Sequence, residues 1–395
     1  MSASPQSGFA FAARHPLLAN LLLVIVSLLV GVLMIDLVTF YLLGMRPIGW
    51  APQRFFQHSS LLGWEHIPYA EGTWYAYKDG TRTHVSINAY GFPDDERTVT
   101  KDRPRIALFG DSTTEYWEVE ADARPQRVMP QLMDGRTEVL NFALRGAGTD
   151  QALLTYRHLA VHFAPDVVVL TVCINDFANN AVQESKPWFV LDPDSPGGIR
   201  LQGMPIRGER LQEEIWWREL PERSFTLRQL KYAVFGMGSH FRTDVPLAEH
   251  PELRPFRRAY DAEDERRKEL LERLVAAFAN FSREHGARFL LVEGLARPVL
   301  DKEQRARVLE IYGDVFDFGR VTRAFEAHSA RAGYEFLSLP GLVRKRGLEV
   351  GDLMHPHDTM HLNAEGARVF SAAVVERLRA LGWIEAAPAA PAGTG

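Results

Sequence analysis

Five short segments of this chain are apolar along nearly their whole length, and this pattern limits the possible folds more than any other feature. A strand that is apolar on both faces has to be buried on both faces, as in a parallel sheet that is covered by helices on each side. The segments are RIALFGDS (105–112), EVLNFAL (138–144), DVVVLTV (166–172), RFLLVEG (288–294) and YEFLSL (334–339).

Helical patterns separate most of these segments. The clearest are residues 151–163, the long amphipathic stretch 262–285, and 364–381, which Asn363 is suited to cap. Strands that alternate with helices in this way indicate βαβ units. The sequence therefore predicts a flavodoxin-like three-layer α/β/α fold with a five-stranded parallel sheet.

The N-terminal region contains a long uncharged stretch. Residues 17–35 read LLANLLLVIVSLLVGVLMI, and these nineteen residues can cross a bilayer core of roughly 30 Å as a helix. The apolar stretch is longer than that of most signal peptides, and no convincing cleavage site follows it. We therefore expect one uncleaved N-terminal transmembrane helix.

The orientation of this helix is less sharply defined by charge. Arg14 precedes it, while Arg46 and Arg54 follow it, so the positive-inside rule is nearly balanced. Because an N-terminal anchor commonly exports the chain that follows, we expect the N-terminus inside and the main domain outside the cytoplasm.

Composition changes along the chain divide it into four parts. A hairpin signal at Lys78-Asp79-Gly80 marks a small appended region, and a second hairpin signal, in 188–203, interrupts the strand–helix alternation. The predicted parts are an N-terminal tail and anchor (1–45), a hairpin region and linker (46–104), the main domain (105–385) with an insertion (178–260), and a low-complexity disordered tail (386–395).

Charge and cysteine content exclude several classes of protein. The formal net charge is −5, from 45 basic and 50 acidic residues, so nucleic-acid binding has no support. The only cysteine, Cys173, permits no intramolecular disulfide, cysteine zinc site or iron–sulfur site. We interpret Cys173 as a buried small residue, and we expect no cofactor.

Four short polar patterns are expected at one edge of the sheet, three directly after strands and one directly before the last helix. Ligands of open α/β sheets bind at the carboxyl ends of the strands, so these patterns are predicted to meet. They are Gly110-Asp111-Ser112, Asn141 to Gly146 (NFALRG), Asn175-Asp176 and Asp358-Thr-Met-His361.

Together these patterns contain the groups that acyl transfer needs. A serine hydroxyl becomes a good nucleophile when a base removes its proton, and His361 can take that proton from Ser112. Asp358, three residues earlier, can hold the imidazole in the required tautomer. An oxyanion needs hydrogen-bond donors, and we expect them from the backbone N–H groups of Ser112 and Gly146 and from the Asn175 amide.

Two alternatives involve neighbouring residues. Asp352 and His355 have the same spacing as the chosen pair, but Pro356 follows them and disfavours a helix there. Four residues, His355, His357, Asp358 and His361, also resemble a metal cluster. We expect no metal, because the nucleophile–base interpretation already accounts for two of the four.

The chain resembles the SGNH (GDSL-like) hydrolases, whose name is matched by Ser112, Gly146, Asn175 and His361. The stretches GDSTTE, NFALRGAGTDQ, NDFANN and HLNAEGA also look like those of bacterial membrane-anchored members, and VSINAYGF resembles a segment that often precedes GDS. The resemblance covers roughly 105–382, more loosely over 178–260. Cys173 departs from it, because many members have Gly there.

The resemblance implies a serine esterase with catalytic Ser112, Asp358 and His361, located in a bacterial inner membrane with a periplasmic domain. Implied substrates are small-molecule, glycan or lipid esters, including O-acyl groups of envelope glycans. Two alternatives stay open. One is an O-acyltransferase of envelope polysaccharide, which would use the same residues, and the other is a non-catalytic glycan-binding module.

Overall fold

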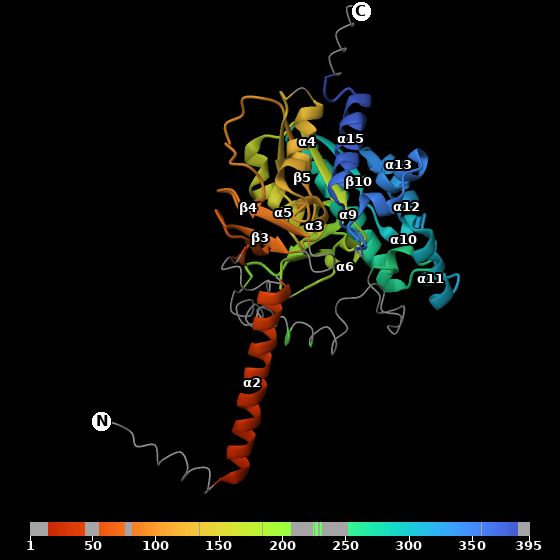
Figure 1. The fold of residues 1–395 in the computed structure, drawn as a ribbon. Helices are drawn as coiled ribbons and strands as arrows, with labels where there is room; N and C mark the ends of the chain where they lie inside the picture. The colour runs from red at the N-terminus through yellow and green to blue at the C-terminus, as the bar shows by residue number, and fades with distance from the viewer. Residues whose placement is uncertain are drawn as a thin grey trace, which may run out of the picture. The chain divides into compact units, whose positions relative to one another are not determined.

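The computed structural model describes residues 15–43, 55–75, 81–133, 135–183, 185–206, 224, 226–227, 230, 252–356 and 358–385. The chain forms two compact units. One contains the N-terminal helix together with the few described residues from 224 to 230, and the other contains the remaining described residues (Figure 1). The predicted domain boundaries stay predictions. The predicted tail, 386–395, lies outside the described residues.

The N-terminal helix, α2 (Pro16–Leu43), coincides with the predicted anchor. Its Pro16–Thr39 part is long and apolar enough to cross a membrane, and the 18-residue stretch within it that meets this criterion has no buried residue. It is the only such helix among the described residues. The expected N-terminal candidate transmembrane helix is therefore present.

The central sheet has five parallel strands in the order β11-β10-β7-β5-β6. In chain order this is 2-1-3-4-5, the flavodoxin-like arrangement, whose switch point lies between the first and third strands. The predicted fold is thus confirmed. The strands are β5 (Arg105–Phe109), β6 (Glu138–Asn141), β7 (Val167–Val172), β10 (Arg288–Glu293) and β11 (Glu335–Ser338).

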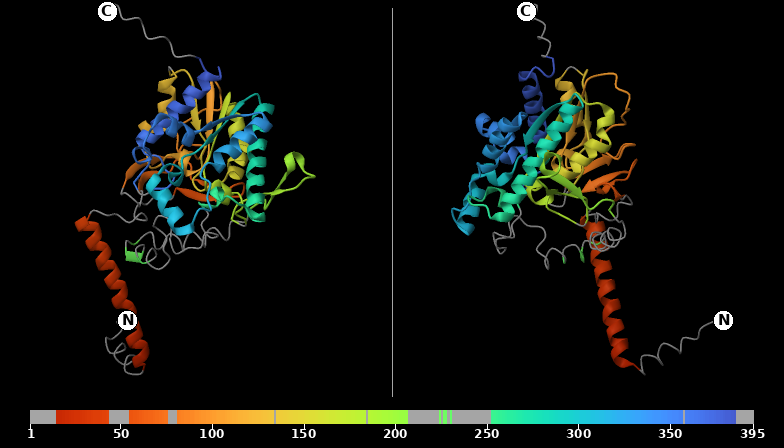
Figure 2. Two further views of the ribbon diagram at one scale, coloured as in Figure 1. Left: turned by 90° about the vertical axis from the view of Figure 1, so that its right-hand side faces the viewer. Right: turned by 180° about the vertical axis from the view of Figure 1, so that it is seen from behind.

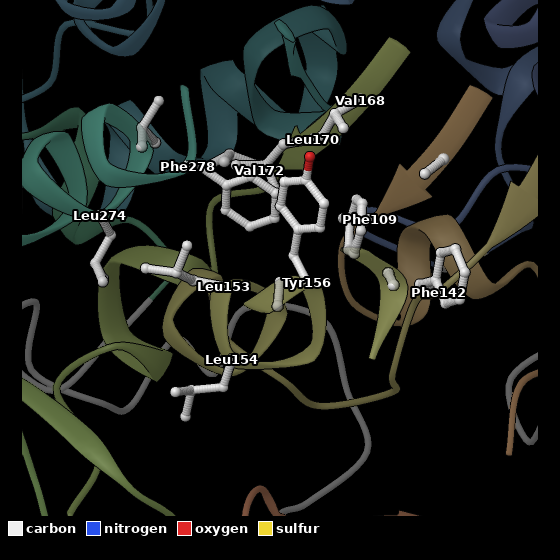
Figure 3. Close-up of a cluster of buried hydrophobic side chains, with 14 of the residues drawn as sticks. Phe109, Phe142, Leu153, Leu154, Tyr156, Val168, Leu170, Val172, Leu274 and Phe278 are labelled. Carbon is white, nitrogen blue, oxygen red and sulfur yellow. The ribbon is translucent and has the colours of Figure 1, made fainter. Parts of the chain in front are cut away.

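Side chains alternate between the two faces of this sheet, and each face has its own apolar core. Phe109, Leu170 and Leu291 point into one core and pack against α5 (Thr149–His158) and α9 (Ala262–Glu284) (Figure 3). Leu108, Val169 and Val292 point into the other core. That face is covered by α4 (Pro125–Leu132), α13 (Leu339–Arg346) and α15 (Ala364–Ala380). Figure 2 shows α9 and α15 on opposite sides of the strands.

The three expected helices are present, with small differences at their ends. The first, α5, begins at Thr149 and ends at His158, and a 3₁₀ turn, η3 (Ala160–Phe163), follows it. The last, α15, is capped as predicted, since Asn363 Oδ1 accepts a hydrogen bond from the Gly366 N–H at 2.9 Å. Short helices that the sequence did not predict include α10 (Arg297–Leu300), α11 (Lys302–Tyr312), α12 (Arg320–Ala332) and α14 (Val350–Leu353).

Two antiparallel pairs precede the sheet in the chain. They are β1 (Phe56–Ser59) with β2 (Gly63–His66), and β3 (Glu71–Tyr75) with β4 (Arg82–Ser86). The predicted turn at 78–80 lies outside the described residues, although the strands on either side of it are paired. A third pair, β8 (Trp188–Leu191) with β9 (Ile199–Gln202), begins the predicted insertion. Most of the insertion after 206 lies outside the described residues.

Candidate active site

The chain turns sharply where β5 ends and the short helix α3 (Ser112–Glu115) begins. A Cβ atom at Gly110 would overlap the side chain of Thr114, so the turn requires glycine. Asp111 caps the helix, because its Oδ1 accepts hydrogen bonds from the N–H and hydroxyl of Thr113 at 2.9 and 2.8 Å. Ser112 is consequently held at the first position of α3, beside the switch point of the sheet.

The structure brings together the three residues expected to be catalytic. His361 Nε2 lies 2.9 Å from Ser112 Oγ, and His361 Nδ1 lies 3.0 Å from Asp358 Oδ1. Asp358 Oδ1 also accepts hydrogen bonds from the backbone N–H groups of Met360 and His361, at 2.9 and 3.0 Å. The three-residue spacing thus forms a tight loop in which the carboxylate and the imidazole meet.

This loop is attached to the end of β10 by Arg297, a residue that sequence reasoning missed. Arg297 Nε donates to the backbone carbonyl of Asp358 at 2.6 Å, and Nη2 donates to that of His355 at 2.9 Å. The Arg297 N–H also donates to the carbonyl of Thr359 at 2.8 Å. Arg297 lies more than 50 positions before the loop, so local spacing gave no signal for this contact.

The residues expected to bind the oxyanion lie on the loops that follow β5, β6 and β7. Gly146 has a φ of +75°, a conformation that glycine adopts without strain. In the described part of the chain, the backbone N–H groups of Ser112 and Gly146 donate no hydrogen bond to another protein group. The Asn175 amide nitrogen donates to the Asp111 carboxylate, which fixes the orientation of the side chain.

A buried carboxyl group supports the loop that holds Asn175. Asp176 accepts hydrogen bonds from the Thr149 hydroxyl at 2.8 Å and from the Cys173 N–H at 2.9 Å. Burial, with a further contribution from the negative charge of Asp111, raises the pKa of Asp176 to about 7. Burial therefore favours the neutral form of this carboxyl group.

Cys173 is buried, as expected. Its Sγ lies 3.0 Å from the Thr113 hydroxyl, and burial raises the pKa of the thiol well above its ordinary value. Gly294 directly follows β10, and a Cβ atom at this position would overlap the Cys173 sulfur. Glycine at position 294 therefore leaves the space that the cysteine side chain occupies. The departure from the family pattern at this position is accommodated by the neighbouring strand.

Two opposing effects determine the pKa of His361. Burial of the imidazole, the largest effect, lowers its pKa. The negative charge of Glu118 and the hydrogen bond and charge of Asp358 raise it, and together they outweigh burial. The pKa of His361 therefore lies above its ordinary value of 6.5.

The second Asp-x-x-His pair is positioned differently. Asp352 is exposed, and its backbone carbonyl accepts a hydrogen bond from the Asn363 side chain at 2.9 Å. His355 is partly buried, and its backbone N–H donates to the carbonyl of His361 at 3.2 Å. His357 lies outside the described residues, and the described ones contain no group of three or more potential metal ligands.

A narrow apolar cavity of about 50 Å³ begins at the loop that follows β7. Cys173, Ile174 and Phe177 line its end nearest the Asn175 loop. Residues of α9, α10 and α12, of the 3₁₀ turn η6 (Arg254–Phe256) and of the loop after β10 line the rest, together with Tyr260 and Pro340. Glu293, whose pKa burial raises to about 7, also lines the cavity.

A doubly wound parallel sheet with a serine, a histidine and an aspartate in contact beyond its strands defines a serine hydrolase of the esterase type. The chain belongs to the GDSL-like lipase/acylhydrolase family, whose model matches residues 108–314, more than half of the sequence. The resemblance inferred from the four motifs is thereby confirmed, and the chain is an esterase of this family.

Several solved structures are similar to this chain at low identity. A GDSL-like lipase from Bacteroides thetaiotaomicron is 12% identical over 70% of this chain and 88% of its own, with a TM-score of 0.34. The lipase/acylhydrolase from Enterococcus faecalis is 14% identical over 72% and 100%, with a TM-score of 0.35. An acetyl xylan esterase is 14% identical over 69% and 99%, with a TM-score of 0.36. No curated protein sequence matches the chain.

Proposed function

We propose that the chain hydrolyses a carboxylic ester through an acyl-serine intermediate on Ser112. The observation that carries this proposal is the continuous contact from Ser112 Oγ to His361 Nε2 at 2.9 Å and from His361 Nδ1 to Asp358 at 3.0 Å. A proton that leaves the hydroxyl can move to the imidazole without any rearrangement, and the carboxylate stabilises the imidazolium that forms.

The reaction then has two balanced halves. Ser112 Oγ bonds to the ester carbonyl carbon, its proton passes to His361, and the leaving alkoxide takes that proton as the carbon–oxygen bond breaks. In the second half, His361 removes a proton from water and the hydroxide attacks the acyl carbon. The bond between that carbon and Ser112 Oγ then breaks, the carboxylic acid leaves, and the proton returns from His361 to Ser112 Oγ. In both halves the N–H groups of Ser112 and Gly146 and the Asn175 amide stabilise the oxyanion.

The substrate is proposed to be a carboxylic ester, either an O-acyl group of an envelope glycan or a lipid ester. The same residues would also transfer the acyl group to a sugar hydroxyl if that hydroxyl replaced water in the second half.

Location is the other proposed part of the function. The exposed apolar surface of α2 is expected to hold the chain in a bacterial inner membrane as a single span, with the hydrolase domain on the periplasmic side. The substrate would then be an ester that the domain meets at or near the outer surface of that membrane.

Turnover of p-nitrophenyl acetate, butyrate and octanoate tests this function, with Ser112→Ala as the inactive control. At least one of these esters is expected to be hydrolysed, and added xylose or glucosamine oligomers are expected not to divert acyl groups from water. Formation of acylated sugar at the expense of free acid would indicate the transferase. Binding of the oligomers without turnover of any ester would indicate a glycan-binding module.

A further inference from the structure

Arg145, directly before Gly146, joins the loop that follows β6 to the nucleophile helix α3. Its backbone N–H and Nε donate to the two carboxylate oxygens of Glu115 at 3.1 and 2.9 Å. Its Nη2 donates to Glu118 at 2.8 Å. The side chain of Glu115 is fully buried and those of Arg145 and Glu118 are 18% and 9% exposed, so solvent screens these contacts little.

Residues that precede the matched family region complete this arrangement. The Trp64 indole N–H donates to the Arg145 carbonyl at 3.0 Å, and its ring lies next to the position that a Cβ of Gly146 would occupy. The Arg145 guanidinium lies 4.7 Å from the ring centre of Trp74 and 5.1 Å from that of Trp117. Trp64 and Trp74 both come from the β1–β4 region.

His66, at the end of β2, contacts the same carboxylate. Its Nε2 lies 2.7 Å from Glu115 Oε1, and its Nδ1 lies 2.9 Å from the carbonyl of Gly91. Glu115 therefore contacts the His66 imidazole from β2 on one side and accepts hydrogen bonds from the loop after β6 on the other. Loss of either partner would leave a buried carboxylate incompletely paired.

We propose that Arg145 and Glu118 are positioning residues of the catalytic site, and that the β1–β4 region is an integral part of that site. Arg145 holds the turn that contains Gly146 against the helix that begins at Ser112. Glu118 accepts a hydrogen bond from the Arg145 guanidinium and so helps to hold it in this orientation. This inference rests on the proposed function, because it assigns supporting roles to residues around the proposed nucleophile, base and oxyanion donors.

The charges around His361 make the two supporting roles separable. Asp358 contacts the His361 imidazole from the same loop. Glu118, in the segment after α3, and Arg145, in the segment after β6, carry charges that affect the pKa of this imidazole. Arg297 donates to backbone carbonyls of the loop that contains His361. Glu118 raises the pKa of His361, whereas the positive charge of Arg145 lowers it. Removal of each charge should therefore move the titration of the base in opposite directions.

The test is the pH dependence of kcat/KM on p-nitrophenyl acetate for wild type, Glu118→Gln, Arg145→Met and Arg145→Lys. The acid limb should move to lower pH in Glu118→Gln and to higher pH in Arg145→Met. Arg145→Lys keeps the charge, so its acid limb should stay near that of wild type. Lysine lacks the planar fork, however, and its kcat should still fall on the order of tenfold with KM little changed.

A purely structural role predicts a different pattern. Shifts in the same direction, no shift in either variant, or an Arg145→Lys enzyme with wild-type kcat would overturn the inference. Should Arg145→Met fail to fold, as judged by circular dichroism, Glu118→Gln and Arg145→Lys decide the question alone. Failure of the proposed function would give a different result. In that case Ser112→Ala would retain activity, whatever the Arg145 variants show.

Discussion

Arg297 Nε donates a hydrogen bond of 2.6 Å to the backbone carbonyl oxygen of Asp358, across 61 positions of the chain. The guanidinium thereby binds the backbone of the same loop whose side chains contact Ser112. The loop between α14 and α15 packs into the core through Met354, Met360 and Leu362, and this tether adds hydrogen bonds from a charged donor to its backbone. The orientation of His361 is thus controlled in part from the carboxyl end of β10.

Arg297→Ala is expected to lower kcat/KM about 10²-fold, because a displacement of the base of about 1 Å is enough for such a loss. Each buried carbonyl group that loses its charged donor should also lower the free energy of unfolding by about 1–3 kcal/mol, so the melting temperature should fall. Arg368→Ala, on the exposed face of α15, is the control and should match wild type in both measurements. An Arg297→Ala enzyme with unchanged activity would show that the loop holds its shape without the tether.

The two Asp-x-x-His pairs should respond very differently to substitution. His361→Ala should lower kcat on the order of 10³-fold or more, because it removes the base that activates the serine. Asp358→Asn should also be damaging, since an amide favours the wrong imidazole tautomer. His355→Ala should cost at most roughly tenfold, since its described backbone contact with His361 does not need the imidazole. Steady-state kinetics on one activated ester, with circular dichroism for folding, measures all three, and an inactive His355 variant beside an active His361 variant would reverse the assignment.

The sheet could be predicted from sequence because its strands are apolar on both faces, a signal that is local and strong. The positions of Ser112, Asn175 and the 358–361 loop relative to the sheet followed from it, because parallel strands end at one edge. Helix α15 was predictable from its own Asn363 cap. In α11, by contrast, only Val308 is buried, so no apolar stripe marked that helix.

The supporting residues of the site could not be predicted in the same way. Arg145 and Trp64 are 81 positions apart, and Arg297 and His355 are 58 apart. Each of these contacts depends on two loops that meet only when the sheet has formed. An arginine beside a glycine-containing loop resembles any surface arginine until its carboxylate partners and its burial are known.

Activity should be lost as pH falls, with a midpoint above 6.5. The base must be neutral to accept the serine proton, and the pKa of His361 is raised, so protonation begins at a higher pH than for an ordinary histidine. The midpoint should change little in about 0.5 M salt, because salt screens exposed charges much more than buried ones. The pH profile of kcat/KM on p-nitrophenyl acetate measures it, and a midpoint at or below 6.5 would contradict these electrostatic effects.

The proposed membrane topology predicts which compartment a protease can reach. In intact cells with an opened outer envelope, added protease should digest the hydrolase domain, because the proposed orientation of α2 places this domain outside the cytoplasm. A cytoplasmic marker protein should survive the same treatment. Complete protection of the domain until the cells are lysed would contradict the proposed orientation.

The central claim is that Ser112 carries the acyl group during turnover, and mass spectrometry of the acid-quenched enzyme tests it most directly. Wild type and Ser112→Ala are mixed with p-nitrophenyl acetate, quenched within the first turnovers, digested and mapped. The account predicts an acetyl group on the Ser112 peptide of the wild type, none on that of Ser112→Ala, and a fall in turnover on the order of 10³-fold or more in the latter. An unmodified Ser112 in an active enzyme, or a Ser112→Ala variant within tenfold of wild type, would contradict it.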